Sequence, residues 1–150
     1  MKIRSFIRPL SGENEEREYV WKVMHSHPEW YGEGFQSEWL LNNTFYGIYN
    51  EAGELMGFFS VGVFHKNFYN NEAVINWVNI KDEYRKNGLF NKLVKFVKEK
   101  YSDYMHITIQ GGKKNPTACE IYGRKFTFMR ENDEGDGYWY VIVNREKQVL

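Results

Sequence analysis

The stretch DEYRKNGLFNKLV, residues 82–94, decides the fold, because it joins an apolar strand to an amphipathic helix. The turn between them holds two basic residues, an amide and a glycine: Arg85, Lys86, Asn87 and Gly88. The first N–H groups of a helix lack partners inside the helix and carry partial positive charge. Glycine allows unusual backbone angles and close ligand approach. The turn therefore predicts a phosphate or pyrophosphate site, with plain chain geometry as the other explanation for the glycine.

The segments on either side of this turn predict one βαβ unit. Alternation predicts a strand over residues 72–80, with Val74, Asn76, Val78 and Ile80 sharing one face. A helix over 89–101 carries an apolar stripe, and a strand follows at 105–110. Strands joined in this way are expected to be parallel. The turn is neither a P-loop nor a dinucleotide fingerprint, because the residues that define those motifs are missing.

The rest of the chain predicts strands, hairpins and short helices in one domain over residues 1–150. We expect a strand at 2–8, a helix at 11–26, a loop at 27–36, a hairpin at 44–66 that turns near 50–53, a helix at 116–124, and strands at 126–130 and 138–144. This order predicts an α/β (α+β) fold. Its core would be a mixed, mostly antiparallel sheet of about six or seven strands, flanked by helices.

Composition limits the classes of function. Lys plus Arg and Asp plus Glu are 20 each, so the formal net charge is zero, which makes nucleic acid an unlikely partner. The single cysteine, Cys119, fits a reducing compartment, and we expect a cytoplasmic protein. We expect no membrane partner, because no apolar run reaches the roughly 20 residues that span a bilayer. The four histidines are not spaced as ligand pairs, so no metal is expected.

Two spaced motifs resemble the GNAT acyltransferase superfamily. Its first motif is Arg/Gln-x-x-Gly-x-Gly/Ala at the start of a helix, and Arg85, Gly88 and Phe90 hold the three positions. Phe90 stands where Gly or Ala is usual. The second motif is Asn-x-x-Ala-x-x-Leu-Tyr, held here by Asn115, Ala118, Ile121 and Tyr122. The resemblance covers roughly residues 44 to 144.

The resemblance implies direct transfer of an acyl group from acetyl-CoA, or another acyl-CoA, to an amine. It implies that the strand edge pairs with the pantetheine arm and that backbone N–H groups of the turn bind the pyrophosphate. The cofactor residues it implies are Val78, Asn79, Ile80, Arg85, Lys86, Asn87, Gly88, Leu89, Phe90, Asn115 and Tyr122. Tyr122 would protonate the leaving thiolate, since a tyrosine with a pKa near 10 remains a proton donor at neutral pH.

The amine must also lose a proton, and the family often places a glutamate on the strand before the turn. The aligned position is Val74, which cannot serve. Glu72 is the nearest carboxylate and is our candidate base, with a solvated strand end as the alternative. Asn76 on the same face could orient a water. His65 is a weaker rival. His106 is expected to be structural and Cys119 to pack within a helix.

The acceptor would be a small molecule or a protein amine, bound between the first helical region and the last hairpin. Residues offered for its pocket are His25, His27, Trp30, Tyr31 and Trp39, with Glu131, Asp133, Glu134 and Asp136 attracting a cation. The alternative role of the histidines and aromatic residues is core packing, and that of the acidic residues is a solvated turn. A homodimer is compatible with this interpretation. Two rival functions stay open: a non-catalytic GNAT-fold binding or inhibitory protein, and an acyltransferase directed at tRNA or another nucleic acid.

Overall fold

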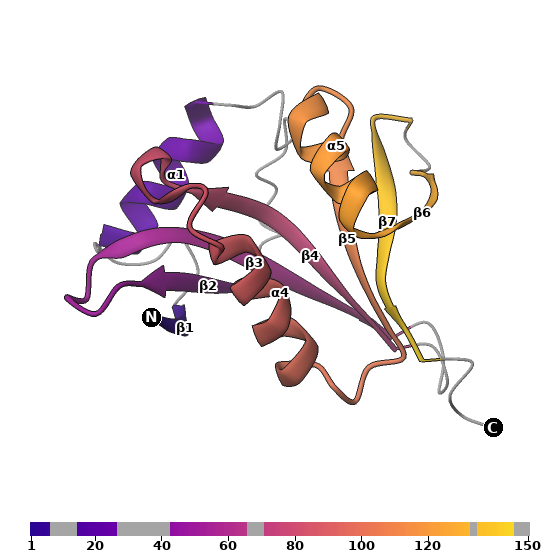
Figure 1. Cartoon of the computed structure of the whole chain (residues 1–150), viewed down its shortest axis with the longest axis horizontal. Coiled ribbons are helices and arrows are strands. Elements are labelled where there is room, and N and C mark those ends of the chain that lie inside the picture. Colours follow the sequence, from indigo (N-terminus) through magenta and orange to yellow (C-terminus); the bar gives the residue numbers. More distant parts are fainter. Residues whose placement is uncertain (7–14, 27–42, 66–70, 133–134, 146–150) are drawn as a thin grey trace.

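The structure is a computed structural model that describes residues 1–6, 15–26, 43–65, 71–132 and 135–145 (Figure 1). Its centre is a seven-stranded sheet in the order β1-β2-β3-β4-β5-β7-β6. The strands are β1 (Lys2–Phe6), β2 (Asn43–Tyr49), β3 (Leu55–His65), β4 (Asn71–Ile80), β5 (His106–Gly112), β6 (Thr127–Glu131) and β7 (Gly137–Asn144). The helices are α1 (Glu15–Ser26), α4 (Leu89–Lys100), α5 (Pro116–Lys125) and the 3₁₀ turn η1 (Asp82–Tyr84).

This architecture confirms the mixed, mostly antiparallel sheet and the single βαβ unit. β4 and β5 pair in parallel, with α4 between them in the chain, and all other neighbours are antiparallel. The β2–β3 turn lies where it was expected, with Gly53 N–H donating to the Asn50 carbonyl at 3.0 Å. The predicted start of the first helix at Ser11 lies outside the described residues. No helix in the described part of the chain is long and apolar enough to cross a membrane.

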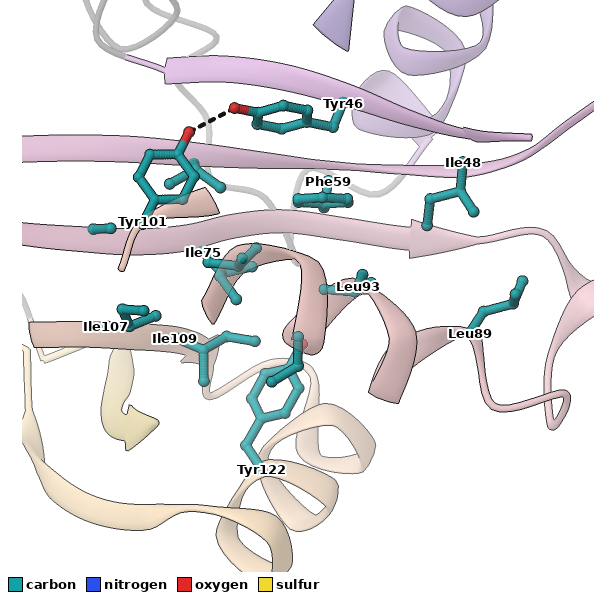
Figure 2. Close-up of a cluster of buried hydrophobic side chains, with 14 of the residues drawn as sticks. Tyr46, Ile48, Phe59, Ile75, Leu89, Leu93, Tyr101, Ile107, Ile109 and Tyr122 are labelled. Carbon is teal, nitrogen blue, oxygen red and sulfur yellow. Dashed lines mark hydrogen bonds between the residues drawn. The ribbon is translucent and has the colours of Figure 1, made fainter. Parts of the chain in front are cut away.

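The two faces of the sheet carry different cores. The larger core lies between the sheet and the helices α4 and α5, and Figure 2 shows Leu89 and Leu93 of α4 packed against it. It also contains a buried hydroxyl pair, in which the oxygens of Tyr46 and Tyr101 lie 2.7 Å apart. The smaller core joins α1 to the opposite face through Val20, Val23, Phe45 and Phe58. The sheet is thus covered on both sides, and its faces can be assigned residue by residue.

A β-bulge in β4 corrects one prediction. Ser60 of β3 lies opposite Asn76, whereas Phe58 lies opposite Asn79, so β4 gains one residue there. Trp77 takes a left-handed φ of 46° at this point. The extra residue reverses the alternation of side chains. Val78 and Ile80 therefore pack on the larger core with Ala73 and Ile75, while Asn76 faces the α1 side. The predicted common face of Val74, Asn76, Val78 and Ile80 is wrong.

Candidate active site

The turn before α4 has the geometry of an anion site. Gly88 is the N-cap residue with φ 75°, and Lys86 also has a positive φ of 65°. The first helical hydrogen bond runs from Lys92 N–H to the Gly88 carbonyl at 3.2 Å. The N–H groups of the residues between them therefore have no partner within the helix. The first turn of α4 carries no acidic side chain, so nothing within it opposes an approaching anion.

Arg85 stabilises this turn through two side-chain bonds, to the backbone and to a neighbouring carboxylate. Its Nε donates to the Ile80 carbonyl at 2.7 Å, and its Nη1 lies 2.8 Å from Asp82 Oδ1. Both bonds tie the turn to the end of β4 and to η1. The half-exposed guanidinium thus fixes the path of the backbone, while the neighbouring Lys86, Asn87 and Gly88 are exposed.

β4 and β5 stop pairing at Ile75, before β4 reaches this turn. Their parallel pairing runs from Glu72 opposite His106 to Ile75 opposite Ile109. Beyond that point β5 continues beside β7, while β4 continues beside β3 and diverges from β5 (Figure 1). The last part of β4, Val78 to Ile80, therefore has one edge that β5 does not cover. An extended amide-bearing molecule can add to such an edge by backbone hydrogen bonding.

Tyr122 lies on α5, beside β5. It is 8% exposed and stacks on Phe90 of α4, with ring centroids 5.6 Å apart and an interplanar angle of 19°. Tyr140 of β7 meets its edge at 5.9 Å. Asn115 begins the same helix, and its side chain accepts a hydrogen bond from Ala118 N–H at 3.3 Å, so it acts as the N-cap. Phe90, at the unusual motif position, is therefore the residue that packs directly on the candidate acid.

Glu72 lies in the paired part of the two strands. Its carboxylate accepts a hydrogen bond from Thr108 Oγ1 at 2.9 Å, and Thr108 is buried. Asn76 is four residues further along β4, which corresponds to about 13 Å of extended chain. Glu72 is on the same face of β4 as Asn76, as predicted, because Ala73 and Ile75 between them face the larger core, but it lies away from the point where the strands separate. His106 lies opposite Glu72 in the ladder, and of His65 only the backbone is described.

A polar cluster on the α1 face lies at the separation point, and sequence analysis had offered only one of its members. Asn76 Nδ2 donates to Asn43 Oδ1 at 3.1 Å. Ser60 Oγ lies 3.3 Å from the same oxygen and 3.1 Å from the Asn76 carbonyl. Ser60 is fully buried and Asn43 nearly so. The sequence feature that could have indicated this polar cluster is Ser60, a single hydroxyl in the apolar run MGFFSVGVF.

Among the acidic residues offered for the acceptor, the two that are described, Glu131 and Asp136, both have partners within the protein. Glu131 forms an ion pair with Lys113, which raises the pKa of that lysine. Asp136 accepts a hydrogen bond from Asn132 Nδ2 at 2.6 Å. Asp133 and Glu134 lie outside the described residues. So do His27, Trp30, Tyr31 and Trp39 and the side chain of His25.

Cys119 behaves as a packing residue in α5. Its Sγ donates to the Gly112 carbonyl at 3.2 Å, and burial raises the pKa of the thiol. A thiol with a raised pKa is less ionised at neutral pH and hence less nucleophilic. Within the described ranges, no group of three or more His, Cys, Asp or Glu side chains is placed to hold a metal ion.

Comparison with known proteins identifies the class. The model of the acetyltransferase (GNAT) family matches residues 10–128. A comparison with curated proteins finds no match. Among solved structures, a GNAT-family acetyltransferase from Staphylococcus aureus Mu50 superposes with a TM-score of 0.61 at 13% identity, covering 93% of this chain and 98% of the other.

Two further structures show the same fold. Arabidopsis thaliana NAA60 in complex with acetyl-CoA has a TM-score of 0.60 at 16% identity, covering 93% of this chain and 96% of that protein. A spermidine N-acetyltransferase SpeG variant from Vibrio cholerae has a TM-score of 0.56 at 13% identity, covering 97% and 96%.

The chain belongs to the acetyltransferase (GNAT) family, since the family model covers most of its length. It is an acyl-CoA-dependent N-acetyltransferase, and the family predicted from the two motifs is confirmed.

Proposed function

We propose that this protein transfers an acetyl group directly from acetyl-CoA to a primary amine of a small molecule or protein. The observation that carries the proposal is the junction of β4 and α4. There a strand that has left its parallel partner after Ile75 runs into a glycine-capped helix N-terminus. The strand edge that β5 does not cover and the helix N-terminus suit the two polar parts of one cofactor, an amide-bearing arm and a pyrophosphate.

The cofactor would lie along this junction. The edge of Val78, Asn79 and Ile80 would pair with the pantetheine amides. The backbone N–H groups from Lys86 through Phe90, which include those of Asn87, Gly88 and Leu89, would bind the pyrophosphate. Arg85 would act by holding the turn, as its bonds to the Ile80 carbonyl and Asp82 support. Asn115 would contribute by capping the helix that carries Tyr122.

Tyr122 would serve as the acid. The nitrogen–carbon bond forms as the carbon–sulfur bond breaks, and the thiolate takes the phenolic proton. A thiol has a pKa of about 8.5 and a phenol a pKa near 10, so the phenol is protonated at neutral pH and available to donate. Stacking on Phe90 supports this role, because it holds the ring in one orientation.

The thiolate gains its proton from Tyr122 and the acceptor nitrogen loses one, and the latter proton must return to the Tyr122 phenolate before the next turnover, so a neutral amine requires no net proton change. Glu72 is the carboxylate that would receive the proton leaving the nitrogen. Its distance along β4 from the separation point means that the proton would reach it through an intervening group or water. The lone cysteine, Cys119, fits the reducing cytoplasm, which we infer as the location.

The test is an acceptor screen with purified protein. Release of free CoA thiol is followed with acetyl-CoA, and acceptors would include spermidine and short peptides with free α-amines. Mass spectrometry of the purified protein would show any co-purified acyl-CoA. We expect at least one amine to be acetylated in an enzyme-dependent manner. Failure to bind acetyl-CoA at millimolar concentration, together with no amine-dependent thiol release, would refute the proposal.

A further inference from the structure

Asn76 is bound to two other strands, to β2 through its side chain and to β3 through its main chain. Its Nδ2 donates to Asn43 Oδ1 of β2 at 3.1 Å, and its main-chain carbonyl accepts from Ser60 Oγ of β3 at 3.1 Å. Gly62 leaves room for this arrangement, because a Cβ there would lie 3.0 Å from Asn43 Oδ1 and 3.4 Å from Asn76 Nδ2. A side chain whose amide nitrogen and main chain are both held in this way is preorganised for contact with a ligand.

The location of Asn76 matches the point of reaction in the proposed function. It follows Ile75, the last residue of β4 that pairs with β5, and precedes the bulge at Trp77. Its side chain lies on the α1 face, opposite the core under α4 and α5. With the cofactor entering from the N-terminus of α4, an acceptor amine would approach from this other face.

The atom of Asn76 that can still accept a hydrogen bond is its side-chain oxygen, Oδ1. The amide nitrogen is used by Asn43, and among the described residues no hydrogen bond to the Oδ1 of Asn76 is formed. Polar atoms at half-buried positions generally have a partner from the protein, water or ligand. A carboxamide oxygen accepts hydrogen bonds and has no donor of its own. Its natural partner at this place is an N–H group.

We propose, on the basis of the proposed function, that Asn76 Oδ1 accepts a hydrogen bond from the attacking amine, with Asn43 and Ser60 as positioning residues. Because a carboxamide takes up no proton at neutral pH, this contact orients an amine that is already neutral. The substrate class is then a primary amine with a pKa near 8, such as the α-amine of a peptide or amino acid. At pH 7.5 about a quarter of such an amine is neutral, against about 0.1% of an alkyl amine of pKa 10.4.

The first experiment uses a short peptide that carries both kinds of amine, a free N-terminal alanine and one lysine. Fragmentation in the mass spectrometer locates the acetyl group. We expect the α-amine to be acetylated roughly 200-fold faster at pH 7.5, following the ratio of neutral fractions. We also expect kcat/KM for the peptide to rise with pH up to the pKa of the α-amine itself. Preferred acetylation of lysine or spermidine, or a profile that levels off well below that pKa, would overturn the assignment.

The second experiment changes the side chain. Asn76→Ala should raise the KM for the peptide at least roughly tenfold and leave the KM for acetyl-CoA unchanged. Asn76→Asp supplies a carboxylate that can accept a proton, so acetylation of lysine relative to the α-amine should increase. Asn144→Asp makes the same charge change at the exposed end of β7, away from Asn76. It should leave the KM for the peptide and the preference for the α-amine over lysine unaltered.

A positioning role for Asn43 predicts non-additive effects. Asn43→Ala should raise the KM for the peptide by a smaller factor, and the double variant with Asn76→Ala should be no worse than Asn76→Ala alone. Additive effects would place Asn43 outside this contact. If acetyl-CoA binds but no amine is acetylated, the proposed function fails. If amines are acetylated with Asn76→Ala unchanged, only the present inference fails.

Discussion

Replacing Gly88 with valine separates ligand binding from backbone strain, because the protein contains a matched control. Gly88 has φ 75° and Gly53, in the β2–β3 turn, has φ 83°. A Cβ built at either position meets nothing within 4 Å. Placing a residue with a Cβ in this left-handed region costs at least about 1–2 kcal/mol. For a chain of this size, that corresponds to a fall in Tm of roughly 2–8 °C in each variant without ligand.

The assay is thermal unfolding with and without acetyl-CoA. Ligand at about 100 times its Kd stabilises by about 2.7 kcal/mol, which raises Tm by roughly 5–11 °C. Gly53→Val should keep this ligand-dependent rise, whereas Gly88→Val should lose most of it, because the valine side chain occupies the path of the pyrophosphate to the backbone. A full rise in Gly88→Val, or none in the parent protein, would refute our interpretation of the turn.

Four further predictions follow from the contacts. Tyr122→Phe should lower kcat at least roughly tenfold with an unchanged KM for acetyl-CoA, since general acid catalysis is worth about 10²–10⁴-fold; full kcat with chemistry rate-limiting would make the hydroxyl structural. Phe90→Ala should retain the acetyl-CoA-induced rise in Tm, and a complete loss would show that this ring is required for folding of the site. Tyr46→Phe should destabilise by about 1–3 kcal/mol in urea unfolding by leaving the Tyr101 hydroxyl unpaired, whereas changing both to Phe should restore most of the loss. Burial, with the bond to Glu16, raises the pKa of Tyr49 to about 12, so its stabilising effect is present below pH 10 and lost as pH rises towards 12; Tyr49→Phe should flatten this part of the stability profile, and an identical alkaline slope in both proteins would contradict it.

The elements with strong periodicity could be predicted from the sequence alone. The apolar stripe of α4 placed Leu89, Leu93 and Val97 in the core, and all three are buried. Pro116 begins α5, where its fixed φ and missing N–H are tolerated. These predictions succeed because burial of one helix face and the chemistry of the first turn act locally, within a few residues of each other.

The position of the candidate site required information that is not local. The separation of β4 from β5 after Ile75 depends on where two strands stop pairing whose partner residues, such as Ile75 and Ile109, are far apart in sequence. The contact of Asn76 with Asn43 and Ser60 joins three strands. Likewise, the stacking of Phe90 on Tyr122 depends on how α4 and α5 lie against each other. Motif spacing indicated which residues matter, but not which of them touch.

The bulge in β4 accounts for the main error, and the sequence did contain a sign of it. Under strict alternation one face of β4 mixes Glu72 and Asn76 with Val78 and Ile80, so neither face is consistently apolar. One extra residue after Ile75 places the apolar pair of these side chains on one face of β4 and the polar pair on the other. The α4 side then receives Ala, Ile, Val and Ile at 73, 75, 78 and 80, as the core contacts show. The α1 side receives the polar Asn76 and Asn79, the latter accepting a hydrogen bond from Tyr19. A strand whose two halves have opposite apolar phase is the pattern that a bulge reconciles, because it shifts the phase by one residue. In this chain that shift returns Val78 and Ile80 to the larger core and turns Asn79 to the α1 face, which Asn76, before the bulge, already occupies.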